Sequence, residues 1–221
     1  MALLTKKEIL DYLKNDKISF EPPLDQCQIQ PHAVDLRLGY SFYIPKKWKL
    51  SENGRIAINF DYFNAKESSQ DNFDLIKLKP GQFFELLPKE FIIASSLEKI
   101  TLRDDQIMAQ LNARSSLLRR GLFIANGTID VKYQGTLTFP IVNNTDTQII
   151  KLYPGERISH LIFETLSSPI SDEDAKMHGL KEAKYLESTP YGLESRSDGE
   201  EEMNLIKSGQ LDQLKEKYKI L

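Results

Sequence analysis

The chain has 221 residues, of which 40% are hydrophobic, so it can bury one sizeable core. Its net charge of −3 and pI of about 5.7 disfavour nucleic acid as a partner, although a local basic cluster can still hold a small anion. Cys27 is the single cysteine, which excludes an internal disulfide framework and a cysteine-based zinc site.

The N-terminal stretch "MALLTKKEILDYLKND" is not typical of a signal peptide, because its apolar part is short and charges follow at once. No apolar run approaches the roughly 20 residues that span a bilayer, so we expect a soluble, cytoplasmic protein with no membrane partner. Thr5 and Glu8 have the spacing of a capping box, and an apolar stripe follows. These signals predict a helix near 5–15.

From Ile18 to about Leu166, short apolar or alternating runs are separated by Pro, Gly, Asn and Asp. The runs are "AVDLRLGYSFYI", "RIAINFDYF", "FDLIKL", "QFFELL", "FIIAS", "QIMAQL", "GLFIA", "GTLTFPIV", "TQIIKLY" and "ISHLIFETL". Many short strands with frequent turn signals predict a mainly β barrel or sandwich rather than βαβ units. The stretch "ARSSLLRRG" is expected to form one or two helical turns between strands.

Residues 167–202 are polar and rich in Ser, Glu and Lys, and "SDGEEE" at 197–202 is a charged break. The last 20 residues have apolar side chains at roughly helical spacing, although Gly209 weakens that pattern. We therefore expect a single domain over 1–196, followed by a charged linker and C-terminal helical extension over 197–221.

The stretch Arg114-Ser115-Ser116, with Arg119 close behind, combines guanidinium groups and hydroxyls that suit phosphate oxygens. A helical turn that begins there would also direct backbone N–H groups at an anion. Taken alone, the stretch is better explained as the cap of a short helix with solvated arginines.

Asp130 stands between Ile129 and Val131 in "GTIDVKYQG", at a tight turn where a carboxylate can orient a water molecule as a general base. Taken alone, Asp130 is better explained as a turn aspartate that bonds its own backbone, and Tyr133 as a packed strand aromatic. Asp35, in the apolar run "HAVDLRLG", needs a partner if buried; Arg37 on the same strand face is one candidate, and contact with a metal-bound water is another.

Four stretches occur in order: "HAVDLRLG", "ARSSLLRRGL", "GTIDVKYQG" and "YPGERISHLIF". Together they resemble the motifs of the superfamily of trimeric dUTPases and dCTP deaminases, over roughly residues 30–166. The resemblance implies a distorted β-barrel or jelly-roll-like fold (the dUTPase-like β-clip) with short terminal helices. It also implies a homotrimer with active sites between subunits.

The resemblance further implies roles for individual residues. Asp130 would activate the attacking water, and Tyr133 would pack on the deoxyribose. The other predicted substrate-binding residues are Arg114, Ser115, Ser116, Arg119, Asn126, Gly127, His160 and Lys184. His160 stands where many dUTPases have glutamine. The cofactor is Mg²⁺ carried by the triphosphate, with no metal bound by the protein itself, apart from the second-shell contact considered for Asp35.

Two features point to different branches of the superfamily. "VDLRLG", "RSSLLR" and "AKYLESTPYGLESR" resemble deaminases, whereas the position that carries their proton-shuttling glutamate is Pro140 here. Loss of ammonia from cytosine needs a general acid or base, but hydrolysis of a phosphoanhydride does not need one at this position. We therefore expect a dUTP diphosphatase that forms dUMP and pyrophosphate. A dCTP deaminase, mono- or bifunctional, and a catalytically silent nucleotide-binding homologue are the alternatives.

Overall fold

The computed structural model describes residues 2–58, 72–178, 181–182, 187–188 and 199–219. The first helix is α1, Lys6–Lys14, and it confirms the predicted capping box. The Glu8 carboxylate accepts hydrogen bonds from the Thr5 backbone N (2.8 Å) and from Thr5 Oγ1 (2.7 Å). This satisfies a backbone donor that the start of the helix would otherwise leave unpaired.

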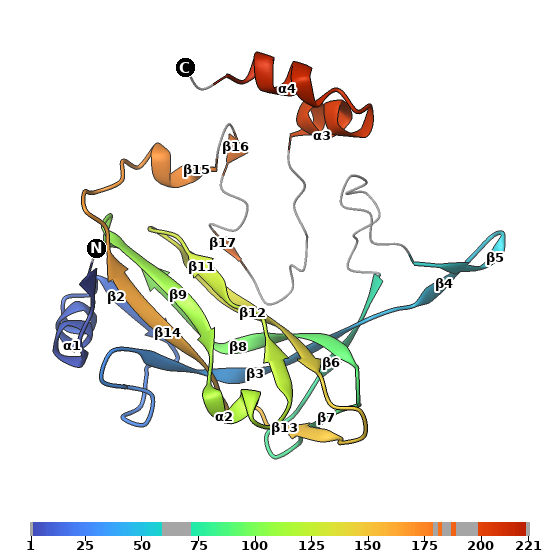
Figure 1. Ribbon diagram of the computed structural model, residues 1–221. Helices are drawn as coiled ribbons and strands as arrows, with labels where there is room; N and C mark the ends of the chain where they lie inside the picture. Colours follow the sequence, from blue (N-terminus) through green and yellow to red (C-terminus); the bar gives the residue numbers. More distant parts are fainter. Residues whose placement is uncertain (1, 59–71, 179–180, 183–186, 189–198, 220–221) are drawn as a thin grey trace.

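Most of the described strand residues belong to one curled, largely antiparallel sheet, as the alternating runs predicted (Figure 1). Its main path has the strand order β10-β12-β8-β3-β14-β9-β11. The strands of this path are β3 (Val34–Pro45), β8 (Phe91–Leu102), β9 (Ile107–Ala113), β10 (Leu122–Ile124), β11 (Gly127–Ile129), β12 (Gln134–Asn143) and β14 (Arg157–Thr165). The fold is therefore mainly β, as expected.

Shorter strands extend this sheet or pair beside it. Four add to the main path: β1 (Ala2–Leu3) on β14, β2 (Ile18–Glu21) on β8, β6 (Phe73–Lys77) on β3 and β17 (Glu187–Ser188) on β12. Three separate ladders are formed by β4 (Trp48–Ser51) with β5 (Gly54–Ala57), β7 (Phe84–Leu86) with β13 (Ile150–Leu152), and β15 (Met177–His178) with β16 (Lys181–Glu182).

The inner face of the curled sheet carries the core. Phe42, Phe139 and Phe163 are fully buried, and the Phe42 and Phe84 rings stack with centroids 4.8 Å apart. Gly39 lies where β3 approaches β8 most closely, since a Cβ atom there would stand 2.6 Å from the Ser96 carbonyl oxygen. Only glycine, which has no Cβ atom, fits between the two strands here. Close packing therefore explains why "HAVDLRLG" ends in glycine.

Further helices in the described ranges are α2 (Ser115–Leu118), the 3-10 turn η3 (Asp174–Lys176), α3 (Glu200–Lys207) and α4 (Leu211–Lys217). The helical pattern near the C-terminus thus forms two short helices that pack on each other (Figure 1). Gly209, which weakened the pattern, has φ +72° and lies between them. A residue in that left-handed conformation ends a helix, which explains the break.

Candidate functional site

The Arg-Ser-Ser stretch forms the turn that follows strand β9. Arg114 is the N-cap of α2, and the Leu117 side chain is buried in the core, which fixes the turn against the sheet. Ser115 and Ser116 are exposed, as is Arg119. Together with Arg114, these three side chains form a polar surface on the segment 114–119.

Arg120, the second arginine of the pair, is directed away from that surface. Its guanidinium forms an ion pair with the Glu156 carboxylate and donates a hydrogen bond to the Lys151 carbonyl oxygen. It therefore ties α2 to the neighbouring loop.

Asn126 and Gly127 lie beside the start of α2. The Asn126 Oδ1 atom accepts a hydrogen bond from the Ala113 backbone N at 3.4 Å, and Gly127 pairs with Leu111 on β9. No atom lies within 4 Å of the position that a Cβ atom of Gly127 would take. The glycine therefore leaves open space next to the Arg-Ser-Ser segment.

Asp130 follows directly after β11, at the end of that strand far from Gly127. Its neighbours Ile129 and Val131 are buried and anchor the backbone on both sides, while Asp130 itself is half-buried. Lys132, with φ +61°, makes the turn into β12. Tyr133 is buried, and its hydroxyl approaches the Thr136 carbonyl oxygen at 3.5 Å.

The sheet register separates Asp130 from the Arg-Ser-Ser segment within one chain. Because Ile129 pairs with Ala109, Asp130 stands next to Met108, six residues along β9 from Arg114. At the rise of an antiparallel strand, this is a separation of about 20 Å. One chain therefore does not bring the two predicted parts of the site together.

The Asp35 side chain is fully buried and has three partners, two on β14 and one at the N-cap of α2. Its Oδ1 atom lies 2.6 Å from His160 Nδ1, and its Oδ2 atom lies 3.1 Å from Arg157 Nη1 and 3.3 Å from Arg114 Nε. The expected pairing with Arg37 is wrong, because Arg37 forms its ion pair with Asp25 at 2.7 Å. Since both carboxylate oxygens are occupied by protein cations and the imidazole, the geometry does not favour a metal-bound water at Asp35.

A second buried acid, Glu98 on β8, was not anticipated from the sequence. Gln28 Nε2 donates to Glu98 Oε1 at 2.7 Å, and the Arg37 backbone N donates to Oε2 at 3.0 Å. Burial raises the pKa of this carboxyl group, although those two hydrogen bonds work against the rise. Its position between Leu97 and Lys99, in a strand that also carries two serines and a threonine, gave no signal of burial.

A proline within a strand is expected at a bulge or at an edge, where its missing N–H breaks no ladder hydrogen bond. The register shift in β12 falls between Thr136 and Thr138, so Pro140 is not at that bulge, and β10 pairs with β12 only from Ile141 to Asn143. The Pro140 carbonyl oxygen accepts from the Ala125 N at 3.1 Å. In an antiparallel strand the N of the same residue faces the same way, so the ring nitrogen faces the side where β10 has ended. The ladder with β8 therefore loses no donor.

Lys184, predicted to reach the phosphates, lies outside the described residues. The nearby strand β17 pairs in parallel with Gln134 and Gly135 of β12. This brings the backbone of the C-terminal segment next to the strand that begins just after Tyr133.

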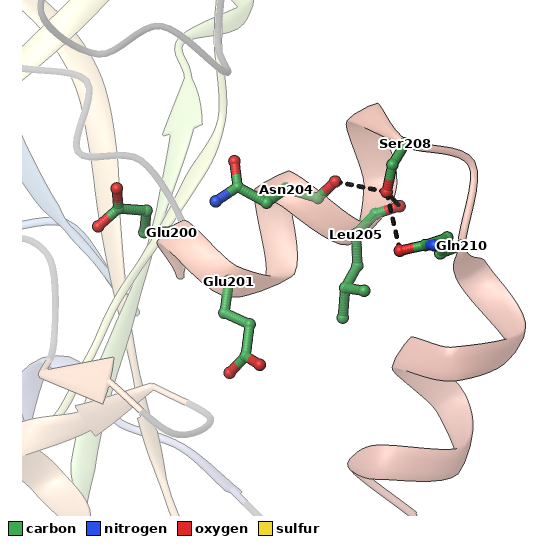
Figure 2. A pocket seen from close by; sticks show the side chains of 6 residues that line it. All are labelled: Glu200, Glu201, Asn204, Leu205, Ser208 and Gln210. Atoms are coloured by element: carbon green, nitrogen blue, oxygen red, sulfur yellow. Dashed lines mark hydrogen bonds between the residues drawn. The ribbon is translucent and has the colours of Figure 1, made fainter.

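Over the described ranges, no group of three or more His, Cys, Asp or Glu side chains could hold a metal ion, and no helix there has the length and apolar character to cross a membrane. A depression of about 620 Å³ lies along α3 and the turn that follows it (Figure 2). It is lined by Glu200, Glu201, Asn204, Leu205, Ser208 and Gln210. None of these is a predicted site residue, and the two carboxylates at one end would repel a polyphosphate.

Comparison with known proteins places these motifs in context. A family model described as dCTP deaminase-like matches residues 3–166. The chain is 35% identical to a protein named "dCTP deaminase, dUMP-forming" from Methanosphaera stadtmanae, over 86% of this chain and 91% of that one. A protein of the same name from Methanobrevibacter smithii is 32% identical over 84% of this chain and 91% of its own length.

Among solved structures, a 2'-deoxycytidine 5'-triphosphate deaminase from Agrobacterium tumefaciens superposes with a TM-score of 0.56 and 23% identity. The match covers 78% of this chain and half of that one, and it supports the fold. The relatives named as deaminases overturn the expectation of a dUTP diphosphatase, and with it the exclusion of deaminase activity. The expectation rested mainly on one strand position, Pro140. The similarity to deaminases over 84–86% of the chain outweighs that single position.

Proposed function

Because the chain belongs to the dCTP deaminase-like family, we propose that it is a dCTP deaminase of the dUMP-forming type. The reaction would release ammonia from the cytosine ring and pyrophosphate from the triphosphate, leaving dUMP. The observation that carries the proposal is the similarity to proteins of that name over 84–86% of the chain. The four ordered motifs lie within the matched part.

Within this proposal, the exposed Arg-Ser-Ser segment with Arg119 binds the phosphates. Guanidinium groups offer paired donors to phosphate oxygens, and the hydroxyls of Ser115 and Ser116 add two more contacts. Lys184 is proposed to complete this contact from the C-terminal segment. Mg²⁺ enters as an ion carried by the triphosphate, since the donor set of the segment is cationic and hydroxylic rather than carboxylate. The ion would neutralise phosphate charge.

Asp130 and Tyr133 are proposed to act on the sugar side of the nucleotide. Asp130 would orient the water that attacks the phosphoanhydride, and Tyr133 would pack on the deoxyribose. Since about 20 Å separates Asp130 from Arg114 along β9, we infer that the two parts come from different copies of the chain.

The outer face of the sheet supports such an assembly, for which we propose a homotrimer. Phe123, Val142 and Phe91 stand directly opposite one another across β10, β12 and β8. Phe123 is 59% exposed and Phe91 is 39% exposed. Contiguous apolar surface of this kind is typical of a protein–protein interface. Docking of copies on this stripe, the apolar row formed by Phe123, Val142 and Phe91, would bury it.

One observation favours a second candidate, a homologue that binds the nucleotide without deaminating it. The neighbours of Pro140 on its face of the sheet are Thr138 and Val142 along β12 and Ile93 on β8, and none has an acidic group. Deamination would then require an acid or base from another part of the assembled site.

A product assay separates the two candidates. The protein is incubated with Mg²⁺ and dCTP, and ammonia, pyrophosphate and dUMP are measured together. The proposed activity gives all three in equal amounts. Binding of dCTP by calorimetry without any product supports the second candidate, and the absence of binding contradicts both.

A further inference from the structure

The contacts beneath the Arg-Ser-Ser segment form one buried cluster. Asp35 on β3 lies under Arg114, Arg157 and His160, which come from the end of β9 and from β14. Cross-strand pairing aligns β3, β14 and β9 here, since His160 on β14 is opposite Asp35 on β3 and opposite Asn112 on β9. The register of the sheet therefore fixes which side chains meet the carboxylate.

The cluster has more positive than negative charge. One carboxylate oxygen, Oδ2, is shared by the guanidinium groups of Arg114 and Arg157. The Asp35 side chain is fully buried, whereas those of Arg114 and Arg157 are 23% and 32% exposed. The surplus positive charge therefore faces solvent, next to exposed Ser115 and Ser116, which is the arrangement that attracts an anion.

Arg114 is held at two points. Its Nε atom faces Asp35, and its Nη1 atom donates to the Arg157 carbonyl oxygen at 2.9 Å. Among the described residues, Nη2 has no recorded partner. A guanidinium group fixed along one edge presents its remaining donors in a set direction, and this lowers the entropy cost of binding an anion.

His160 completes the arrangement by fixing the carboxylate. Because the Asp35 oxygen accepts, the Nδ1 atom of His160 carries the proton in this contact, at 2.6 Å. The bond occupies Oδ1 and so leaves Oδ2 to the two arginines. His160 therefore contacts the buried acid rather than standing free to meet a phosphate with this nitrogen.

We propose that Asp35 is a positioning residue, which with His160 orients Arg114 and Arg157 toward the polyphosphate of the nucleotide. Arg157 is thereby a second cation of the phosphate subsite, which sequence reasoning did not select. The inference rests on the proposed function for the identity of the nucleotide. The anion site itself does not depend on the proposed function. The positioning role of Asp35 and the proposed function can therefore fail separately.

The test uses three substitutions at two residues, and three ligands. Asp35→Asn keeps the shape and removes the charge. His160→Leu removes the bond to Oδ1, and His160→Asn restores a donor near the place of Nδ1. Calorimetry measures binding of inorganic tripolyphosphate and of α,β-imido-dCTP, and ligand-observed NMR measures binding of 2'-deoxycytidine. The control is Asp16→Asn, which removes the carboxylate of another aspartate–arginine pair, formed with Arg103 at 2.8 Å.

We expect Asp35→Asn to weaken binding of tripolyphosphate and imido-dCTP about 10- to 100-fold, the range for losing a charge-assisted hydrogen bond that orients a ligand group. Affinity for 2'-deoxycytidine, which has no phosphate, should stay within about twofold. His160→Leu should weaken the two phosphate ligands about 3- to 10-fold, and His160→Asn should recover most of that loss. The control should change none of the affinities.

The proposal is overturned if folded Asp35→Asn retains wild-type affinity for the phosphate ligands, or loses affinity for all three ligands equally. If Asp35→Asn does not unfold cooperatively, the two His160 variants provide the test instead. Unchanged affinity of His160→Leu for the phosphate ligands then overturns the proposal. Wild-type protein that binds tripolyphosphate but not imido-dCTP, with loss in Asp35→Asn, supports the positioning role and contradicts the proposed function. Wild-type protein that binds neither contradicts both.

Discussion

Pro140→Glu would return a carboxyl group to the strand position where the deaminases of the superfamily are expected to have one. The side chain at 140 is half-buried and projects to the outer face of β12, since Phe139 and Ile141 on either side are buried in the core. A positioned acid or base contributes about 10²- to 10⁴-fold to a proton-transfer step. We therefore expect ammonia release from dCTP to rise at least about 100-fold, and pyrophosphate release to rise with it, because the proposed activity releases one of each per turnover.

The structure also indicates that this substitution is compatible with folding. Replacing proline frees the unfolded chain, at a cost of about 0.4–1 kcal/mol. The new N–H would face Ala125, where a further hydrogen bond can contribute about 1 kcal/mol, so the two effects nearly cancel. The midpoint of urea unfolding checks this balance.

The assay follows ammonia and pyrophosphate in parallel, with Pro140→Gln as the matched control. Glutamine has nearly the same shape as glutamate but no acid, so it should bind dCTP without the gain. If folded Pro140→Glu binds dCTP and releases ammonia no faster than Pro140→Gln, position 140 is not the position of the acid, and the reasoning from the β12 motif is refuted.

Three further predictions follow from the site and its surroundings. Asp130→Asn should lower pyrophosphate release at least about 100-fold and leave dCTP affinity within a few-fold; turnover near the wild-type rate would remove the role of Asp130 as base. Burial raises the pKa of Glu98, so the folded chain holds that proton more tightly than the unfolded chain. Its contribution to stability is thus complete below the unfolded pKa and is lost as pH rises through the folded pKa. Glu98→Gln should accordingly show a smaller fall in the free energy of unfolding over that interval, and an identical slope in both proteins would contradict the buried-acid assignment. Phe123→Glu should dissociate the oligomer in light-scattering chromatography, whereas Leu211→Glu, at a comparably exposed site on α4, should not; equal masses for both would exclude the β10–β12–β8 stripe as the interface.

Local signals in the sequence predicted the local structure well. The capping box at Thr5 and Glu8 and the alternating runs from Ile18 to Leu166 depend on neighbours a few residues apart, and the structure confirms both. The turn at Ser115–Leu118 likewise follows from its own stretch of sequence.

The partners of buried groups were not predictable in the same way. Asp35 and His160 are 125 residues apart in sequence, and only the register of β3 against β14 brings them together. The alternation of β3 suggested Arg37 instead, because it offered the nearest cation on the same strand face. Whether the Pro140 nitrogen faces a strand of the ladder also depends on where β10 ends, and no local sequence pattern predicts the end of β10.

The measurement that tests the central claim most directly is the stoichiometry of products from dCTP. Purified protein with Mg²⁺ and dCTP is sampled over time for ammonia, pyrophosphate and dUMP, with Asp130→Asn as the reference for lost pyrophosphate release. Our account predicts one ammonia and one pyrophosphate for every dUMP formed. Binding of dCTP without release of ammonia would contradict the assignment as a dUMP-forming dCTP deaminase.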